Sequence, residues 1–567
     1  MFYLIERPLR HLLKDIVFPT EIAFTTPPNP DLGDLALPCF EIGKRKGKNP
    51  VEVAKEIESK VNSPDGGLKS KVIDDVRAVG PFVNFFLNGQ EVAKLVLPEV
   101  NEKFGRHSFG NDKKIMVEFG CPNPLKVFHL GHLKNLITGE AIVRILQNMG
   151  YSVIRANYQG DVGLHVAKAL WGIFNWLDQF EDSKKMSLED RIAFLGKAYA
   201  HGAKHFEAGE TAKEEILAYN NKVYTHDVTI QTVYQTARQW SLEYFDSIYK
   251  KLGSHFDKLY FESEVTLRGA ALVFEFLKKD IFKKSQGAII FEGSRYGLHD
   301  RVFLNSEGFP TYEAKELALA EMRYNEFHPD SIIHVVGKEQ TEYFKVVFKA
   351  LEFVVPESGG KEVHLPGGFL RLKGGKMSSR TGNVIAGDQL IELVDTRVRG
   401  IMTKSDHKEN EDTIRKITNA VLKYSLLKVD VRSDVVFDME ESVSTSGDSG
   451  PYLLYTIARI KSILRKAITI LPKTTIPVEI NVNEKKLLLR LSLFPEVTKE
   501  AGETFDPARI ARYIFSLAQE FQAFYDICPV LQADETTRSF RLEIIHCVEQ
   551  VMTRGLYLLG IEPVEEM

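Results

Sequence analysis

The sequence predicts an α/β protein in which a parallel-sheet domain lies between a mixed α+β domain and an all-helical domain. Three patterns carry this prediction: strand and helix patterns mixed before about residue 108, a strand–helix–strand alternation that begins near residue 114, and helix-spaced apolar residues from about residue 404 onward. At 567 residues the chain is too long for a single hydrophobic core, so several domains are expected.

The central domain is predicted over residues 109–403 from apolar runs of strand length. Residues 114–119 (KIMVEF) and 151–156 (YSVIRA) flank a helix-spaced apolar pattern, which makes a βαβ unit, and residues 331–336 (SIIHVV) add a buried strand. A mostly helical stretch, roughly residues 164–256, interrupts the alternation and carries no catalytic motif. We therefore expect a Rossmann-like parallel sheet with a helical insertion.

The two flanking domains are predicted over residues 1–108 and 404–567. In the first, a helix is expected after Asn49 and Pro50, and two strands are expected on either side of a Gly-Pro turn, at residues 72–79 and 82–87. The second domain reads as a helical bundle. Its helices are expected at residues 414–427, 452–468, 484–491, 507–525 and 538–559.

Composition restricts the class of protein. Hydrophobic residues make up 44% of the chain and charged residues 26%, as in ordinary globular proteins, and the net charge of -4 gives no global signal for nucleic acid. No apolar run reaches the length of a membrane span, so no membrane partner is expected. The four cysteines are scattered, so we expect neither structural zinc nor a disulfide framework, and a reducing cytoplasm fits.

Residues 121–132 (CPNPLKVFHLGH) lie where the first strand of the βαβ unit leads into the helix. The free N–H groups and positive dipole end of such a helix attract phosphate. His129 and His132 are three residues apart, so within the first helical turn both can donate to one phosphoryl group. Gly131 lets a base or ribose approach the backbone. The alternative is that the two histidines are only caps and surface polar groups.

Residues 370–383 (LRLKGGKMSSRTGN) form a second candidate motif. Paired glycines followed by Lys376, two serines, an arginine and another glycine make a basic loop that is rich in hydrogen-bond donors. Such a loop suits a leaving pyrophosphate, although a solvated basic turn would have a similar composition.

In combination, these two motifs resemble the two ATP-binding signatures of class I aminoacyl-tRNA synthetases. Residues 118–126 (EFGCPNPLK) are similar to the arginyl-tRNA synthetase version of the first signature, and residues 309–318 and 335–340 are similar to the arginine-pocket segments of that family. Residues 419–427 and 449–460 resemble its helical anticodon-binding domain. The resemblance covers nearly the whole chain, which is thereby identified as a member of this family.

The resemblance implies ATP-dependent activation of L-arginine, with Mg²⁺, and its transfer to tRNA(Arg) by a protein that we expect to be a monomer. It implies that the N-terminal domain contacts the outer corner of tRNA. It gives catalytic roles to His129, His132 and Lys376. The expected ATP contacts are His129, Gly131, His132, Lys376, Met377 and Ser378. The weaker candidates for tRNA contact are Tyr452, Tyr455 and Arg459.

The chemistry of arginine supports the pocket that the resemblance implies. A guanidinium is planar, always charged and carries five donors, so a selective pocket needs carboxylates and neutral acceptors in a fixed fork. Glu118, Glu316 and Tyr312 fit this need, although Glu316 could instead be an exposed helical carboxylate. The resemblance places Asn123 and Gln340 near the α-amino and α-carboxyl groups of the amino acid, and Lys126 close to the reacting carboxylate and phosphate.

Three positions depart from the common pattern of the family. Ser379 stands where class I signatures usually have a lysine, so we expect an enzyme that needs bound tRNA before it activates the amino acid. Val162 follows Asp161 where many members have tryptophan, which puts a stacking role of that position in doubt. Glu316 stands where aspartate is common.

Two alternatives stay open at this point. A synthetase for another amino acid or a small nucleotidylyltransferase could use the same His-x-Gly-His motif, although a nucleotidylyltransferase would not need the C-terminal bundle. The chain could also be an inactive paralogue that binds RNA or scaffolds partners. Such a protein would have little reason to retain both histidines, Lys376 and the pocket carboxylates.

Overall fold

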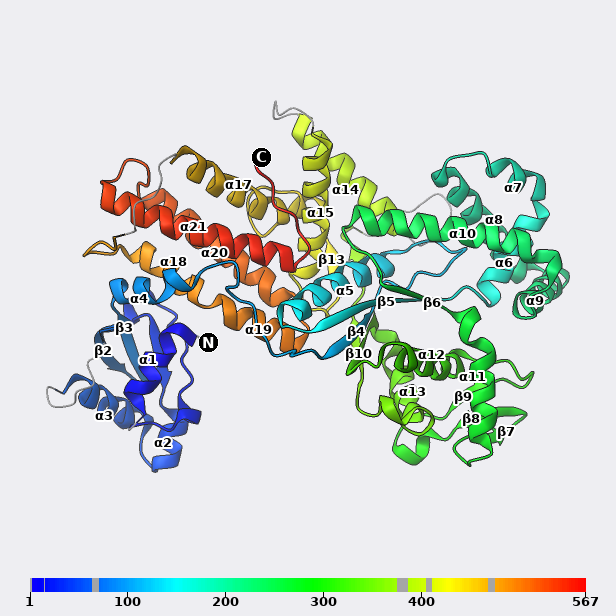
Figure 1. Ribbon diagram of the computed structural model, residues 1–567, viewed down its shortest axis with the longest axis horizontal. Helices are drawn as coiled ribbons and strands as arrows, with labels where there is room; N and C mark the ends of the chain where they lie inside the picture. Colours follow the sequence, from blue (N-terminus) through cyan, green and yellow to red (C-terminus); the bar gives the residue numbers. More distant parts are fainter. Residues whose placement is uncertain (1–2, 15, 64–70, 375–385, 404–409, 468–474) are drawn as a thin grey trace. The chain divides into compact units, whose positions relative to one another are not determined.

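The computed structural model describes residues 3–14, 16–63, 71–374, 386–403, 410–467 and 475–567. They form two compact units: Ser108–Ser444 is one, and Met1–His107 with Thr445–Met567 is the other. Figure 1 labels most of the helices and strands of both. No helix within the described ranges has both the length and the apolar character needed to cross a membrane.

A five-stranded parallel sheet is the centre of the Ser108–Ser444 unit, which confirms the predicted α/β class (Figure 1). Its strand order is β11-β10-β4-β5-β6. The strands span Lys114–Glu118 (β4), Ser152–Gln159 (β5), Lys258–Phe261 (β6), Ser331–Gly337 (β10) and Glu362–Gly367 (β11). The three strands predicted from apolar runs are β4, β5 and β10, because a sheet covered by helices needs continuously apolar strands.

Helix α5 (Leu130–Asn148) connects β4 to β5 and is buried along most of its length. It packs against the sheet and against two later helices, α14 (Gly387–Met402) and α15 (Glu411–Leu427). Lys134 is also buried on α5, and its Nζ donates to the carbonyl groups of Gly368, Val431 and Ser433 at 2.7, 3.1 and 3.2 Å. The ammonium group therefore ties α5 to the chain that follows β11.

The predicted helical insertion lies between β5 and β6. It comprises α6 (Leu164–Asn175), α7 (Leu177–Ser183), α8 (Leu188–Ala208), α9 (Glu210–Tyr224) and α10 (Val228–Lys251). These helices share a separate apolar core that includes Trp240, and Trp171 is buried beside it. Trp176 packs against the same core and is partly buried. The three tryptophans of the insertion therefore lie in its apolar core or pack against it.

Between β6 and β10 the chain forms a small layer that the sequence analysis did not predict. It contains α11 (Glu262–Leu277), an antiparallel sheet of β7 (Lys283–Ser285), β8 (Ala288–Phe291) and β9 (Arg301–Leu304), and α12 (Tyr312–Phe327). Helix α13 (Thr341–Val354) follows β10 after a short 3-10 turn at Lys338–Gln340. After β11, β12 (Leu370–Leu372) pairs with β13 (Val435–Phe437), and α16 (Met439–Ser442) ends the unit.

The N-terminal part of the other unit is α+β, as predicted. Its antiparallel sheet has the order β1-β3-β2. The strands are β1 (Leu35–Pro38), β2 (Ile73–Val79) and β3 (Phe82–Leu87), and the helices are α1 (Tyr3–Leu13), α2 (Phe40–Lys46), α3 (Pro50–Asn62) and α4 (Gly89–Val96). Short 3-10 turns lie at Pro19–Glu21, Pro30–Leu32 and Leu97–Glu99.

Five helices complete this unit: α17 (Gly450–Lys466), α18 (Val482–Ser492), α19 (Phe494–Thr504), α20 (Ala508–Ile527) and α21 (Glu535–Leu558). Four of them confirm predicted helices, and α19 was missed. The helices pack on the N-terminal part through α4 and α18. Lys485 of α18 lies 2.9 Å from the Asp34 carboxylate, and Thr498 of α19 donates to the carbonyl of Gly105.

Two glycines set the closest approach of α6 and α8. A Cβ atom on Gly172 would lie 2.1 Å from the carbonyl oxygen of Ala198, and one on Gly202 would lie 2.0 Å from that of Lys168. Each glycine thus receives the backbone of the other helix, and neither position has room for a side chain.

We therefore expect Gly172→Ala to separate the two helices and to lower the free energy of unfolding by about 1–3 kcal/mol, the usual effect of overpacking. Gly196→Ala on α8 is the matched control, because a Cβ there meets no atom within 4 Å. That variant should be more stable by up to about 1 kcal/mol, since alanine favours the helix. Urea unfolding followed by tryptophan fluorescence measures both, and equal stability of the two variants would contradict the packing argument.

Candidate active site

The candidate site lies at the carboxyl ends of the parallel strands. Strand β4 is central, and the chain leaves it toward β5 on one side and returns later to β10 on the other. In sheets of this kind, the crevice at such a reversal is where ligands bind. The first helix after β4 is α5, so its N-terminus opens into this crevice with its free N–H groups and positive dipole end.

His129 and His132 cap this helix reciprocally. The N–H groups of Gly131 and His132 donate to Nδ1 of His129 at 3.1 and 3.4 Å, and the N–H of His129 donates to Nδ1 of His132 at 3.3 Å. The two rings stack with centroids 3.5 Å apart. The sequence predicts His129 within the first helical turn, but this residue lies just before the helix, at its N-cap. The capping role that was left open as an alternative is therefore present. An imidazole that accepts at Nδ1 carries its proton on Nε2.

Both imidazoles are held in the neutral form. Burial, then the nearby Lys126, lowers the pKa of His129 to about 4. Burial, then His129 and Lys126, holds the pKa of His132 well below its usual range. Near neutral pH each ring therefore offers one Nε2–H donor and no net charge. Capping and ligand binding use different nitrogens of the same ring, so the two roles are compatible.

Gly131 leaves room for the His129 ring in the cap. A Cβ atom at this position would lie 3.0 Å from Cε1 and 3.1 Å from Nδ1 of His129. A side chain would therefore push the His129 ring away from the N–H groups that it accepts. This adds a structural reason for the glycine to the ligand approach that the sequence analysis suggested.

The segment between β4 and α5 places Asn123 and Lys126. Cys121 and Leu125 have positive φ angles of 48° and 61°, so the segment turns sharply twice. Asn123 Oδ1 accepts the N–H of Gly160 at 3.1 Å, which fixes its side chain at the carboxyl end of β5. Lys126 is exposed and close enough to both histidines to lower their pKa values.

Glu118 ends β4 in a buried ionic network. It contacts the guanidinium of Arg323 on α12, and its Oε1 lies 3.2 Å from Nδ1 of His334 on β10. The other ring nitrogen of His334 lies 2.7 Å from Glu362 on β11. The structure thus gives Glu118 a guanidinium of the protein itself as a partner, where the sequence analysis expected the guanidinium of a ligand.

Glu316 lies on α12, two helical turns before the buried Arg323, and is itself 7% exposed. Among the described residues its nearest cation is Arg323, whose Nη1 is 4.0 Å from Glu316 Oε2, beyond hydrogen-bond distance. Burial raises the pKa of Glu316 to about 7, and Glu362 and Glu262 add to the shift against the opposing effect of His334. A desolvated carboxylate without a close counter-ion is unfavourable in the absence of a cationic ligand.

Two tyrosines near Glu316 were not predicted. The hydroxyl of Tyr158, on β5, is buried without a hydrogen-bond partner among the described residues. Burial, then Glu262 and Glu316, raises its pKa, and burial and Glu316 also raise that of Tyr343 on α13. A signal existed in the sequence, because Tyr158 lies in the last two residues of an apolar strand, where ligands bind in this fold.

The remaining predicted pocket residues are more open. Tyr312 begins α12 and is 56% exposed, and burial of its hydroxyl end raises its pKa to about 12. Gln340 is exposed at the N-terminus of α13. Lys315, next to Glu316, is buried and donates to Glu262 Oε2 at 2.8 Å. The structure therefore brings Glu316 together with Tyr158, Tyr343 and Glu262, while Tyr312 and Gln340 lie in more exposed positions.

Asp161 has a structural role at the root of the insertion. Its carboxylate accepts the N–H and hydroxyl of Ser263 at 2.9 and 2.8 Å and lies 3.0 Å from Nε of Arg238. The Tyr234 hydroxyl donates to its carbonyl oxygen at 2.9 Å. Val162, the departure noted after Asp161, belongs to the core of the insertion. Asp161 thus joins the start of the insertion to α10 and to the chain that returns from it.

Residues 375–383 of the second motif lie outside the described residues, and they include Lys376, Met377, Ser378 and Ser379. On either side of that gap, β12 ends at Leu372 and α14 begins at Gly387. The backbones of Ala386 and His129 pair in an isolated antiparallel bridge, and the N–H of Gly387 donates to the carbonyl of Phe128 at 2.6 Å. The chain that follows the second motif is therefore attached directly to the first.

The three tRNA candidates lie together on α17. Arg459 donates to the Tyr455 hydroxyl and to Gln522 Oε1, both at 2.6 Å, and its guanidinium lies 4.7 Å from the Tyr455 ring centroid. The ring of Tyr525 on α20 lies 5.8 Å from the same guanidinium. Tyr452 packs edge-on against Phe515. The arrangement is a partly exposed aromatic surface with a cation at its centre.

Among the described residues, no group of three or more His, Cys, Asp or Glu side chains is placed to hold a metal ion. The four cysteines carry free thiols, and three of them are buried.

Comparison with known proteins defines the class. A family model for the catalytic domain of class I tRNA synthetases of the arginine type matches residues 94–439, which is more than half of the chain. Two further models flank it: the arginyl-tRNA synthetase N-terminal domain matches residues 4–87, and the DALR anticodon binding domain matches residues 453–567. The chain is thus built as a class I aminoacyl-tRNA synthetase.

Whole-chain relatives narrow the class to one family. An arginine–tRNA ligase of Treponema denticola is 32% identical over 573 residues, covering 98% of this chain and 96% of the relative. Another, from Clostridium perfringens, is 32% identical and covers 95% of both chains. The chain therefore belongs to the arginyl-tRNA synthetase family, as the resemblance predicted.

Solved structures of this family share the fold. The Thermus thermophilus arginyl-tRNA synthetase aligns over 100% of both chains with a TM-score of 0.80 at 24% identity. The Plasmodium falciparum arginyl-tRNA synthetase aligns over 100% of this chain and 98% of its own with a TM-score of 0.74 at 19% identity. At these identities the likeness establishes the fold.

Because the nearest cation to Glu316 among the described residues is 4.0 Å away, we expect the ionised form of Glu316 to destabilise the folded protein. Its pKa is about 7 in the folded protein and about 4.5 when unfolded, so folding binds a proton between these values and stability falls as the pH rises through that window. Above pH 7 the full loss, on the order of 3 kcal/mol, is present. Without ligands, Glu316→Gln should therefore melt at a higher temperature than the wild type at pH 8, with most of the gain absent at pH 5.

Glu313→Gln is the matched control, because Glu313 lies on the same helix but is 3.0 Å from Arg301. Its loss removes an ion pair and should not raise the melting temperature. If Glu316→Gln melted lower than the wild type at pH 8, Glu316 would have a partner that stabilises its charge.

Proposed function

We propose that this chain attaches L-arginine to tRNA(Arg) in two steps. Arginine and MgATP give arginyl-adenylate and pyrophosphate, and the activated carbonyl is then transferred to the terminal ribose of the tRNA with release of AMP. The observation that carries the proposal is Glu316, a buried carboxylate whose nearest cation among the described residues is 4.0 Å away, together with a helix N-terminus capped by two neutral histidines at the carboxyl ends of the same sheet. A cationic amino acid and a nucleotide phosphate complete these two features.

His129 and His132 are proposed to stabilise the α-phosphate while the carboxylate of arginine attacks it. Their Nε2–H groups are donors fixed by the reciprocal cap, so they require little reorganisation as negative charge develops. Lys126 is proposed to lie near the reacting carboxylate, and Lys376 to neutralise the departing pyrophosphate. Mg²⁺ enters this scheme with ATP and neutralises its phosphates.

The guanidinium of arginine is proposed to bind Glu316, with the hydroxyls of Tyr158 and Tyr312 as neutral acceptors. Glu118 is proposed to act through Arg323, which it holds against the same pocket. This arrangement leaves one uncompensated carboxylate for one cationic ligand. Asn123 and Gln340, at the carboxyl ends of β5 and β10, are proposed to hold the α-amino and α-carboxyl groups.

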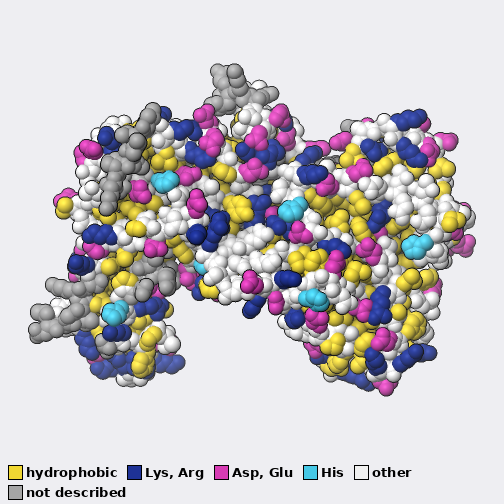
Figure 2. Space-filling view, in the orientation of Figure 1, with side chains coloured by type: hydrophobic (Ala, Val, Ile, Leu, Met, Phe, Trp, Pro, Cys, Tyr) yellow, Lys and Arg dark blue, Asp and Glu magenta, His cyan; other side chains and the backbone are white. Residues whose placement is uncertain are grey.

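The tRNA is proposed to contact both parts of the unit that contains the chain ends. Tyr452, Tyr455 and Arg459 suit stacking of unpaired bases. In the N-terminal part, Figure 2 shows Lys and Arg side chains gathered over the region where Figure 1 places α2. Within this basic group Arg45 is paired with Glu21 and Lys48 with Glu56, whereas Lys44 and Lys46 have no ion-pair partner among the described residues.

We further propose that tRNA binding is needed for arginine activation, because Ser379 replaces a cation that would face the pyrophosphate. In this view the chain works as three domains, residues 1–108 and 404–567 for tRNA and residues 109–403 for catalysis. Binding of tRNA would then supply the free energy that assembles the competent site.

ATP–pyrophosphate exchange measured with each amino acid, with and without a tRNA(Arg) transcript, tests the function. We expect exchange with arginine alone among the standard amino acids, and little of it until tRNA is added. Citrulline should not support exchange, since a neutral ligand leaves Glu316 uncompensated. Exchange with another amino acid would overturn the substrate assignment. Fast arginine-dependent exchange without tRNA would overturn the requirement for tRNA but not the reaction.

A His132→Ala variant is the control for this experiment, because a lower exchange rate in the variant shows that the activity comes from this protein. His132→Ala should lower the rate of arginine-dependent exchange by roughly 10²- to 10³-fold, as expected when one preorganised donor to a developing charge is lost. Arginine binding should change little, because the pocket of Glu316 is left intact. A variant with the wild-type rate would remove His132 from the site.

Arginine affinity should depend on pH through Glu316, because only the ionised carboxylate pairs with the guanidinium. With a pKa of about 7 in the free enzyme, the ionised fraction falls about tenfold between pH 8 and pH 6. Calorimetry should therefore give a dissociation constant for arginine that rises about tenfold over this interval. ATP provides the comparison, since the pKa values of both histidines lie below the interval and their contribution to its binding should stay constant. A flat profile for arginine would exclude Glu316 as its counter-ion.

A further inference from the structure

We propose that one face of the insertion helix α10 positions the His129–His132 signature for reaction, and that Tyr244 does so by holding Asp388 at the start of α14. The face consists of Ser241, Tyr244 and Phe245, which we call the α10 bracing face. These residues are spaced i, i+3 and i+4 and therefore lie side by side on the helix. The proposal rests on the proposed function and adds positioning residues that do not themselves contact substrate.

Two members of the bracing face contact the segment that leads into the signature. The N–H of Leu125 donates to Ser241 Oγ at 3.0 Å, at the point where Leu125 adopts a positive φ of 61°. Phe245 lies against Phe128, with ring centroids 6.2 Å apart, and Phe128 in turn lies 5.5 Å from the His132 ring. Ser241 thus stabilises an unfavourable backbone conformation, and Phe245 supports the residue before His129.

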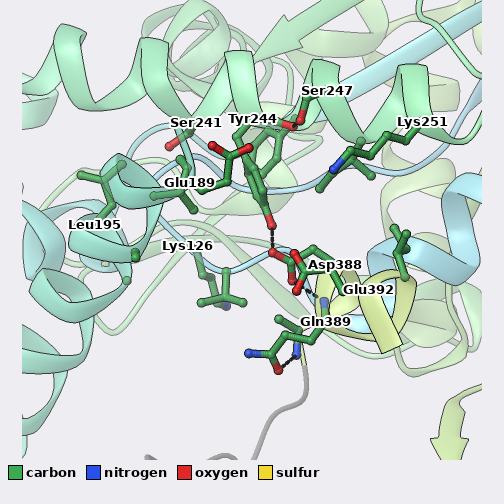
Figure 3. Close-up of a pocket in the computed structure, with 18 of the residues that line it drawn as sticks. Lys126, Glu189, Leu195, Ser241, Tyr244, Ser247, Lys251, Asp388, Gln389 and Glu392 are labelled. Carbon is green, nitrogen blue, oxygen red and sulfur yellow. Dashed lines mark hydrogen bonds between the residues drawn. The ribbon is translucent and has the colours of Figure 1, made fainter. Parts of the chain in front are cut away.

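Tyr244 acts on the signature indirectly, through the start of α14. Figure 3 shows its side chain extending from α10 to Asp388, to which the hydroxyl donates a hydrogen bond. Asp388 lies in the first turn of α14, next to Gly387. The N–H of Gly387 donates to Phe128 O at 2.6 Å, and Ala386 pairs with His129. The Tyr244–Asp388 bond therefore holds α14 at the place where its backbone holds that of His129.

The contact between α14 and the signature leaves little room for error. A Cβ atom on Gly387 would lie 2.8 Å from the Phe128 ring and 3.1 Å from the carbonyl oxygen of His129. A small shift of the start of α14 must therefore move Phe128 or the His129 backbone. Because the Nε2–H of His129 must point at one phosphate, such a shift changes the geometry of the reaction.

The surroundings of Tyr244 make its hydrogen bond important. A cavity of about 350 Å³ lies between α8, α10 and α14, and Tyr244 and Asp388 both line it. In a close-packed interior, neighbouring side chains would hold Asp388 even without the hydroxyl. Beside a cavity, fewer side chains hold Asp388, so loss of the hydrogen bond allows the start of α14 to shift. The helical insertion thereby contributes to catalysis without carrying a catalytic residue.

Steady-state arginylation of a tRNA(Arg) transcript by the full-length Tyr244→Phe variant tests this inference. We expect kcat to fall by roughly 10- to 100-fold, as for a small misplacement of reacting groups, and KM for ATP to rise while KM for arginine stays within about twofold. The KM for arginine should change little because Glu316 and the tyrosines near it lie on β5, α12 and α13, which are not part of the α10 bracing face or of α14. Tyr219→Phe on α9 is the matched control, since it removes a hydroxyl from the insertion and keeps the ring packed on Phe174.

Asp388 variants distinguish positioning from general destabilisation. Asp388→Ala should reproduce the kinetics of Tyr244→Phe, the double variant should be no slower than either single variant, and Asp388→Asn should restore most of the activity because its amide oxygen still accepts the hydrogen bond. Additive losses would overturn the proposed link, as would equal increases in KM for both substrates together with a lower melting temperature. Wild-type rates in Tyr244→Phe would overturn it while leaving the function intact, whereas a wild-type protein that fails to arginylate tRNA would overturn the function itself.

Discussion

The reciprocal cap between His129 and His132 is the constraint on which the rest of the site depends. A helix that starts at the edge of a parallel sheet leaves N–H groups unpaired, and here two imidazole nitrogens accept hydrogen bonds from them. This requires neutral rings, and burial supplies that condition by lowering both pKa values. Gly131 helps because a Cβ at this position would crowd the His129 ring, at 3.0 Å from Cε1 and 3.1 Å from Nδ1. The N-terminus of α5 therefore presents two oriented Nε2–H donors on rings that carry no charge.

The carboxylates at the other end of the crevice are divided between structure and ligand. Glu118 contacts Arg323, and Glu118 and Glu362 both lie within hydrogen-bond distance of His334, so these buried contacts join β4, β10, β11 and α12. Glu316 is left with a cation only at 4.0 Å. A pocket with every carboxylate paired would have no net attraction for a guanidinium, and one with several unpaired would not fold well. One uncompensated carboxylate in a rigid frame combines selectivity with stability.

The amount that could be predicted from the sequence follows from the range of the interactions involved. Strands β4, β5 and β10 were predictable because continuous apolar runs of this length belong in a covered sheet. The sheet of β7, β8 and β9 was not, since strands of three or four residues with Lys283 and Ser285 in them have no clear period. Glu118 and Arg323 are far apart in sequence, so no local pattern could show that they meet. A buried histidine in the apolar run of β10 was the one local sign of that network.

The insertion illustrates how a segment without a catalytic motif can determine catalytic geometry. Asp161 binds Ser263 and Arg238, so one buried carboxylate joins the exit of the chain from β5, the helix α10 and the return of the chain into α11. With both ends of the insertion held at the edge of the sheet, α10 has a defined position relative to the signature. Ser241, Tyr244 and Phe245 therefore make their contacts from a helix whose position is fixed. Loop length alone would allow the insertion many positions. This anchoring is what allows the hydrogen bonds of Ser241 and Tyr244 to Leu125 and Asp388 to position the signature.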